Sequence, residues 1–400
     1  MKKDKKWIKF RHSVVTALAR HLIGTYTRLR YNVTVEKIKD SNKRQYLLIT
    51  NHQTGLDQFI MGMAIKRPVY YIASEDLFSN GFVSKLLRWA VAPIPIKKQT
   101  TDVHAVMTCL RVAKEGGNIA LAPEGNRTFS GKTGYFNPAL IKLMKKLNLP
   151  MAIMRIKKGY GVQPRWSDVV RKGKMRAVIS RIIEPEEFKS MKDNELYDLI
   201  AKELYVDDND SDVSFVSNKK AEYIERAMYV CPKCGLSTFE SNGNEVYCKE
   251  CGLKATYNEN ITMSGEGWPY KTPGEWYDAQ CEFVNSLDII SLKDKLLYEE
   301  RANLWEVILY DRKKILCKDV SLRLYGGKLE IEGRNLFFSF SFEDTSAFTV
   351  LGKNKLNIYY GDKVYQLKGE KRFNALKYVN LFHRYKNVCE GNENGKFLGL

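Results

Sequence analysis

Residues 49–57 read Ile49-Thr50-Asn51-His52-Gln53-Thr54-Gly55-Leu56-Asp57, and they begin inside an apolar run, Tyr46–Thr50, that predicts a buried strand. His52 and Asp57 are five positions apart, so they lie on different faces of a helix and meet only if the chain bends between them. Gly55 permits such a bend. If the side chains meet, the carboxylate holds one imidazole nitrogen and leaves the other free as a general base. The same residues also fit a surface loop in which Asp57 caps a following helix.

A second segment, Ile119–Thr128, reads as a strand that runs into the loop Pro123-Glu124-Gly125-Asn126-Arg127. Taken alone, this loop fits a turn with solvated charges. Taken with His52 and Asp57, in this order and at this spacing, the two motifs resemble the glycerolipid acyltransferase family, whose members acylate glycerol 3-phosphate and lysophosphatidic acid. The resemblance covers about the first half of the chain.

The chemistry of acyl transfer suits these residues. A thioester is already activated, so transfer to a hydroxyl requires a base, stabilisation of the oxyanion and a held acceptor, but no covalent nucleophile and no catalytic cofactor. His52 fits the base, and Asp57 would fix its tautomer. Arg127 fits a phosphate because a guanidinium holds two phosphate oxygens at once. The resemblance implies an acceptor-binding set made of Glu124, Gly125, Asn126 and Arg127.

The sequence departs from the family pattern in two places. Lys98 stands where the family usually has an arginine, so the charge is kept but the bidentate fork for phosphate is lost. The block Pro150–Met154 lacks the family's second proline. The acceptor is therefore less defined than the reaction: lysophosphatidic acid is the first expectation, and another lysophospholipid or a different hydroxyl at the membrane is the alternative. The expected acyl donor is acyl-CoA or an acyl-carrier-protein thioester.

Strand-like and helix-like segments alternate over residues 32–205, which predicts an α/β acyltransferase domain with a mostly parallel sheet. His52 and Glu124 each follow a strand, so both are expected at one edge of this sheet. Residues 1–31 predict a basic amphipathic helix. This helix either enters a lipid headgroup layer or packs on its own domain.

The net charge of +19 is concentrated in one half of the chain. Residues 1–200 hold 37 Lys and Arg against 16 Asp and Glu, whereas residues 201–400 hold 28 against 30. Such a field attracts phosphate on lipid headgroups, on acyl-carrier substrates or on nucleic acid. There is no secretory signal pattern and no run of about 18–20 apolar residues that could span a bilayer. We therefore expect a cytoplasmic protein, peripheral on the inner face of an anionic membrane.

Four cysteines form two Cys-x2-Cys pairs, Cys231 with Cys234 and Cys248 with Cys251. Two such knuckles favour a tetrahedral structural Zn2+, and the segment 229–256 resembles a zinc ribbon. A closed four-cysteine site has no open position for catalysis. A redox dithiol is the lesser alternative.

The remaining segments are expected to be a linker at 206–228, a helical linker at 257–302 and a tail at 391–400. Short strands between 303 and 390, closed by one amphipathic helix, resemble a pleckstrin-homology-like barrel. Its near-neutral composition leaves open a headgroup, a peptide or only a neighbouring domain as its ligand.

A competing hypothesis takes the zinc ribbon and the positive charge together as a nucleic-acid-binding or lipid-binding module without catalysis. The ribbon itself carries no basic patch, which disfavours nucleic acid as a partner.

Overall fold

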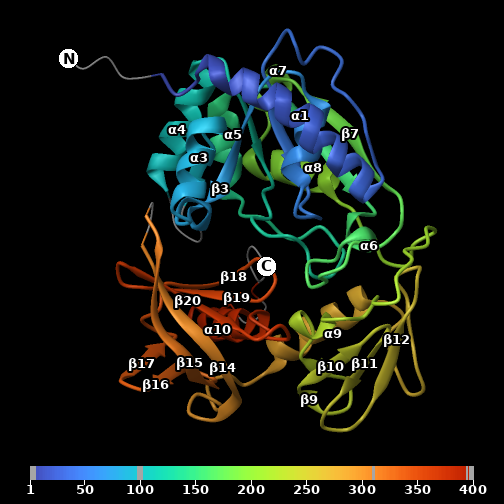
Figure 1. Cartoon of the computed structure of the whole chain (residues 1–400), viewed down its shortest axis with the longest axis vertical. Coiled ribbons are helices and arrows are strands. Elements are labelled where there is room, and N and C mark those ends of the chain that lie inside the picture. Colours follow the sequence, from blue (N-terminus) through green and yellow to red (C-terminus); the bar gives the residue numbers. More distant parts are fainter. Residues whose placement is uncertain (1–5, 97–101, 309–310, 393–394, 396–400) are drawn as a thin grey trace.

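The computed structural model describes residues 6–96, 102–308, 311–392 and 395. An α/β domain lies at one end of the molecule, and the cysteine-containing ribbon and a curled antiparallel sheet lie side by side beneath it (Figure 1).

The α/β domain is built on a seven-stranded sheet with the order β1-β7-β6-β2-β5-β3-β4. Within the described residues its neighbouring strands run parallel, except that β6 and β7 are antiparallel. The prediction of a mostly parallel sheet is thus confirmed. The strands are β1 (Val33–Val35), β2 (Leu47–Thr50), β3 (Val69–Ser74), β4 (Ile94–Ile96), β5 (Asn118–Leu121), β6 (Met151–Lys157) and β7 (Met175–Ile183).

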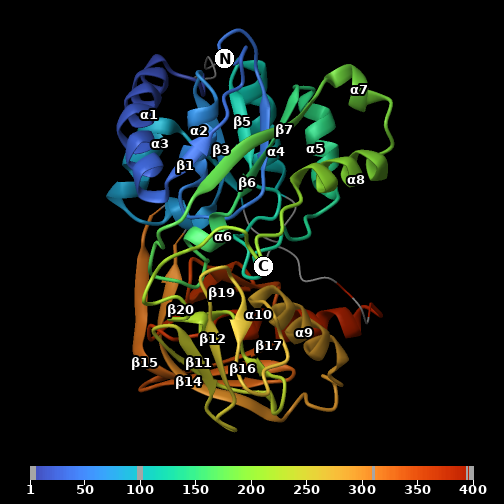
Figure 2. The ribbon, with the colours of Figure 1, turned by 90° about the vertical axis from the view of Figure 1, so that its right-hand side faces the viewer.

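Helices cover both faces of this sheet, with α1 and α3 on one side and α5 and α8 on the other (Figure 2). The central strand β2 is buried throughout because its side chains alternate between the two layers. Leu47 and Ile49 join the core under α4, α5 and α8, whereas Tyr46 and Leu48 join the core under α2. The helices are α1 (Phe10–Tyr31), α2 (Asp57–Ala64), α3 (Phe82–Val91), α4 (Val103–Lys114), α5 (Ala139–Leu147), α6 (Gly159–Val162), α7 (Pro185–Lys189) and α8 (Asp193–Leu204), with a 3-10 turn η1 (Glu75–Phe78).

The segment 206–228 is mostly irregular, apart from the 3-10 turn η2 (Ile224–Arg226), but it is closely packed. Phe215 is fully buried, and the buried Asp208 accepts hydrogen bonds from the backbone N–H groups of Lys158 (2.7 Å) and Tyr160 (3.1 Å). This segment therefore fastens the ribbon to the α/β domain.

The ribbon consists of short antiparallel strands with α9 packed beside them. The buried indole of Trp276 on α9 donates to the carbonyl of Val230, 2.8 Å away. The elements are β8 (Val230–Cys231), β9 (Gly235–Leu236), β10 (Phe239–Asn242), β11 (Glu245–Cys248), β12 (Lys254–Tyr257), β13 (Met263–Ser264) and α9 (Pro273–Ser286).

The last domain is a curled seven-stranded antiparallel sheet, a half-barrel with the order β17-β16-β15-β14-β20-β19-β18, and α10 packs against β18. Its likeness to a pleckstrin-homology-like barrel stays a prediction. The elements are β14 (Leu296–Val307), β15 (Lys313–Tyr325), β16 (Lys328–Gly333), β17 (Leu336–Ser341), β18 (Ala347–Leu351), β19 (Lys355–Tyr360), β20 (Lys363–Gly369) and α10 (Leu376–Cys389).

One expectation in this region is corrected. The helical linker at 257–302 is helical only over α9, which ends at Ser286, and residues from Leu296 onward belong to β14. The run Leu296–Arg301 is rich in residues that favour helices, but β14 pairs with both β15 and β20. The tertiary pairing therefore overrides the local propensity.

Candidate active site

The turn between β2 and α2 brings His52 and Asp57 together. Nδ1 of His52 lies 2.7 Å from Oδ2 of Asp57. The carboxylate is buried, and it also accepts hydrogen bonds from the backbone N–H groups of Gln53 (2.7 Å) and Thr54 (3.0 Å) and from the hydroxyl of Thr54 (2.6 Å). These donors fix Asp57 in place, so the carboxylate in turn fixes the imidazole ring. The side chain of Asp57 thus accepts hydrogen bonds from the loop that precedes α2. This arrangement differs from the simple helix cap that the sequence also allowed.

The imidazole of His52 is held on its Nδ1 side only, as far as the described residues go. Its side chain is 27% exposed, and no hydrogen bond from a described residue occupies Nε2. Burial lowers the pKa of His52, Asp57 partly offsets this by raising it, and the nearby Arg127 lowers it further. A lowered pKa keeps the ring neutral at neutral pH, which is the state that accepts a proton.

Glu124 follows β5 and lies beside His52, at the same edge of the sheet. One carboxylate oxygen accepts the backbone N–H of His52 (2.7 Å), and the other accepts the backbone N–H of Gly134 (2.6 Å). The side chain is buried, and burial raises its pKa to about 8. Glu124 was expected around the acceptor, but its hydrogen bonds go to the protein backbone. It therefore ties the loop after β5 to the loop after β2.

The other motif residues have distinct environments. Gly125 is exposed and has φ +69°, a left-handed conformation that favours glycine. Asn126 is buried, and its Oδ1 accepts a hydrogen bond from Nη2 of Arg165 (3.2 Å). The guanidinium of Arg127 reaches the turn that carries His52, because its Nη1 lies 3.8 Å from where a Cβ on Gly55 would stand.

The guanidinium of Arg127 is largely enclosed by the protein. Among the described residues, no hydrogen bond or ion pair involves its guanidinium, and burial lowers its pKa. The structure thus gathers His52, Asp57, Glu124 and Arg127, whereas Lys98 lies outside the described residues.

Arg165 was missed by the sequence reasoning. It is fully buried in the loop between α6 and β7, and its Nη1 donates to the backbone carbonyl of Arg127 (2.9 Å). It follows Pro164 and precedes Trp166 in a stretch without periodicity, so the sequence offered only a cation near a proline as a signal.

Comparison with known proteins identifies the first domain. The model of the family described as Acyltransferase matches residues 32–157, which contain both motifs. Residues 32–157 are thus similar to this acyltransferase family, and they contain the His52–Asp57 pair.

Three 1-acyl-sn-glycerol-3-phosphate acyltransferases illustrate the similarity. A chloroplastic enzyme of Brassica napus is 21% identical over 181 residues, which are 44% of this chain and 51% of the relative. A chloroplastic enzyme of Arabidopsis thaliana is 21% identical over 44% of this chain and 49% of its own length, and one from Bacillus subtilis is 21% identical over 38% and 72%. The chain thus spans about half the length of the two plant relatives.

Among solved structures, the 1-acyl-sn-glycerophosphate (LPA) acyltransferase from Thermotoga maritima aligns with 48% of this chain and 75% of its own. The sequence identity is 19% and the TM-score is 0.38.

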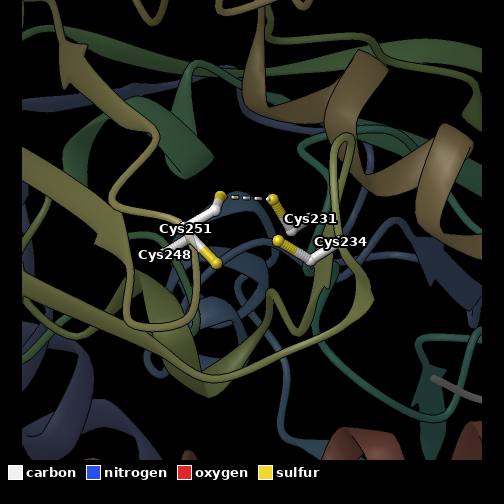
Figure 3. Close-up of side chains that lie close together, drawn as sticks. All are labelled: Cys231, Cys234, Cys248 and Cys251. Carbon is white, nitrogen blue, oxygen red and sulfur yellow. Dashed lines mark hydrogen bonds between the residues drawn. The ribbon is translucent and has the colours of Figure 1, made fainter.

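The four paired cysteines form a separate cluster in the ribbon (Figure 3). Their sulfur atoms all lie within 4.8 Å of one another, and the sulfurs of Cys231 and Cys251 are 3.7 Å apart. A tetrahedron with Zn–S bonds of about 2.3 Å has edges of about 3.8 Å, so the spacing fits Zn2+. Gly235 (φ +78°) and Gly252 (φ +73°) follow the second cysteine of each knuckle in the left-handed conformation that lets the chain turn around an ion.

Proposed function

We propose that this protein transfers an acyl group from a thioester, acyl-CoA or acyl carrier protein, to the free hydroxyl of lysophosphatidic acid or a related lysophospholipid. The observation that carries the proposal is the 2.7 Å contact between His52 and Asp57, beside the guanidinium of Arg127, which pairs with no other described residue, in a region similar to the acyltransferase family. The named activities of the three relatives support the same substrate class.

In the proposed reaction, the acceptor hydroxyl gives its proton to Nε2 of His52 as its oxygen attacks the thioester carbon. Asp57 stabilises the imidazolium through Nδ1–H, as in a hydrolase triad in which the substrate hydroxyl replaces serine. The tetrahedral intermediate then expels the thiolate, and His52 returns the proton to the leaving sulfur. The ester bond forms, the C–S bond breaks and the enzyme is regenerated without a catalytic cofactor.

The acceptor is held by its phosphate. The guanidinium of Arg127 can bind two phosphate oxygens at once. The carboxylate of Asp57, which lies behind the histidine, forms no direct ion pair with this guanidinium. We assign Gly125 the role of leaving room for the headgroup, because no atom of the described residues beyond its two chain neighbours lies within 4 Å of the position that a Cβ would take there. Lys98 is proposed as a further contact to the phosphate.

We further propose that the protein works on the cytoplasmic surface of an anionic membrane. Apolar side chains of α1 and α3 are exposed, and Arg11 links the two helices by donating to the carbonyl of Trp89 (2.8 Å). None of the described helices is both long enough and apolar enough to cross a bilayer. An interfacial face flanked by Lys and Arg is the alternative mode of lipid contact. The face consists of Phe10, Val14, Leu18, Leu22, Tyr26, Leu29, Phe82, Val83, Leu86 and Trp89.

The four-cysteine cluster is proposed to hold a structural Zn2+, which would fold the ribbon and take no part in acyl transfer.

The test is acyl transfer from acyl-CoA, and separately from acyl carrier protein, to lysophosphatidic acid in anionic vesicles. We expect His52→Ala to lower kcat by about 10²–10⁴-fold, the usual contribution of a general base. His104→Ala, an exposed histidine on α4, is the matched control and should keep wild-type activity. Wild-type protein that acylates no lysophospholipid, or a His52→Ala variant as active as the parent, would refute the proposal.

A further inference from the structure

Arg165 joins the acceptor motif to the half-barrel. On one side it donates to the carbonyl of Arg127 (2.9 Å) and to Oδ1 of Asn126 (3.2 Å). On the other side it donates to the carbonyls of Val350 (3.1 Å) and Gly352 (2.9 Å), at the end of β18 and in the turn that follows. A single planar guanidinium therefore binds two segments that are more than two hundred residues apart in the sequence.

The guanidinium of Arg165 is buried without a carboxylate partner among the described residues. It is 1% exposed, and none of the ion pairs within the described residues involves it. Burying a cation without an anion costs free energy, and this burial lowers the pKa of Arg165 well below its ordinary value. The ring of Phe129, 4.2 Å below the guanidinium, and the four oxygen acceptors compensate for part of that cost. Burial alone does not distinguish Arg165, because Arg171 in the same loop is equally buried; its hydrogen bonds to Asn126 and Arg127 do.

A second set of contacts holds the same loop against the second half of the chain. Asp168 pairs with Arg226 (2.8 Å) and with Lys353 (2.8 Å), the neighbour of Gly352, and these two cations lower its pKa to about 2. Arg226 also donates to the carbonyl of Trp166 (2.8 Å). The loop that carries Arg165 is thus held by contacts with both the segment 206–228 and the half-barrel.

We propose that Arg165 is a positioning residue through which the half-barrel turn at residues 350–353 holds Arg127 in place for the acceptor's phosphate. This inference rests on the function proposed above. The segment around Arg127 lies between two supports, because the N–H of Thr128 donates to the carbonyl of His52 (3.0 Å) and Arg165 holds the carbonyl of Arg127. The half-barrel is therefore part of the acceptor site's framework, whatever else it binds.

The role makes a selective prediction. Loss of Arg165 frees the Arg127 backbone, but it leaves the four hydrogen bonds to Asp57 that orient His52. Binding of the acceptor's phosphate should therefore weaken more than the attack step.

The experiment compares lysophosphatidic acid with monoacylglycerol, which has the same hydroxyl chemistry but no phosphate, for wild type, Arg165→Lys and Asp168→Asn. Arg171→Lys is the matched control, because Arg171 is equally buried in the same loop but donates to the carbonyls of Gly161 and Lys220 rather than to the motif. Hydrogen exchange of backbone amides in residues 124–134 is measured in parallel on all variants, as a readout that does not depend on activity.

For Arg165→Lys we expect KM for lysophosphatidic acid to rise about tenfold with kcat within about threefold, because lysine keeps the charge but not the fork. The preference over monoacylglycerol should fall by the same factor, and exchange in residues 124–134 should speed up. Asp168→Asn should change all three in the same direction, and Arg171→Lys should change none of them.

Equal losses on both acceptors, or faster exchange in Arg171→Lys as well, would reduce Arg165 to a purely structural residue and overturn the inference. An Asp168→Asn variant that behaves like wild type in all three measurements would show that the half-barrel has no part in positioning Arg127. Wild-type protein inactive on every lysophospholipid would instead refute the proposed function, and unchanged loop exchange in Arg165→Lys would then reject the positioning role independently.

Discussion

Glu124→Gln tests whether the buried carboxyl holds the two active-site loops together. In the wild type, its two oxygens accept the N–H groups of His52 (2.7 Å) and Gly134 (2.6 Å). At acidic pH the carboxyl of the wild type is protonated, so it has one carbonyl oxygen and one hydroxyl, much as glutamine has one carbonyl oxygen and one NH2 group. The variant should therefore be close to wild type in stability at acidic pH, with a loss of at most about 1–3 kcal/mol for a backbone donor that faces the NH2 group.

The stabilities of the two proteins should separate as the pH rises. Burial raises the pKa of Glu124 from its ordinary value of 4.5 to about 8. Between these values the folded protein keeps a proton that the unfolded chain releases, so the stabilisation is complete below pH 4.5 and is lost as pH rises to 8. A difference of about 3.5 pKa units at about 1.36 kcal/mol each corresponds to about 5 kcal/mol. Glutamine does not titrate, so the variant should be the more stable of the two above pH 8.

The assay is the midpoint of thermal unfolding of wild type and Glu124→Gln between pH 5 and pH 9. Since 1 kcal/mol shifts the midpoint of a domain of this size by about 2–4 °C, the midpoint of the variant relative to wild type should rise by about 10 °C or more across this range. Glu266→Gln, at an exposed glutamate in the ribbon, is the control and should follow the wild-type curve. Curves for wild type and Glu124→Gln that stay parallel at all pH values would show that the carboxyl does not titrate as argued.

Three further predictions concern the base, the metal and the membrane. Asp57→Asn should lower kcat by about 10²–10⁴-fold. Because Asp57 raises the pKa of His52, the acid limb of the pH profile of kcat/KM should also move to lower pH, and a limb that stays in place would contradict this. Metal analysis should find one zinc per chain, and Cys248→Ser should lose it and unfold at least about 5 °C earlier; a metal-free wild type of equal stability opposes the zinc assignment. Replacing Leu22 (67% exposed) and Trp89 (54% exposed) by serine should weaken binding to anionic vesicles at least about tenfold, whereas unchanged sedimentation would exclude this face.

The parts of the structure that sequence could predict are those encoded locally. The approach of Asp57 to His52 needs only a short turn after a buried strand, and both residues lie within that turn. The spacing of the cysteine pairs likewise determines the cluster of four sulfurs. In both cases the residues that make the feature are close in sequence, or are repeated in a recognisable pattern.

The parts that could not be predicted depend on distant partners. Whether Glu124 faces a substrate or a backbone donor depends on where the chain places the N–H group of Gly134, ten residues later. No local sequence pattern predicts that position. Arg165 acquires its role from carbonyl groups of the half-barrel, and backbone acceptors leave no trace in the sequence. The strand from Leu296 was mistaken for helix because its neighbours in the sheet, and not its own composition, decide its conformation.

The two acidic residues of the site act on one histidine in different ways, and this division leaves Arg127 available. Asp57 binds the ring of His52, and Glu124 binds its backbone N–H, so each carboxyl is already occupied by donors of the protein. A carboxylate that instead paired with Arg127 would compete with the phosphate of the proposed acceptor for the same guanidinium. Burial raises the pKa of Glu124, so this carboxyl is largely uncharged at neutral pH and would compete little. A buried glutamate within an arginine-containing motif is therefore compatible with the proposed phosphate binding, because its burial suppresses its charge.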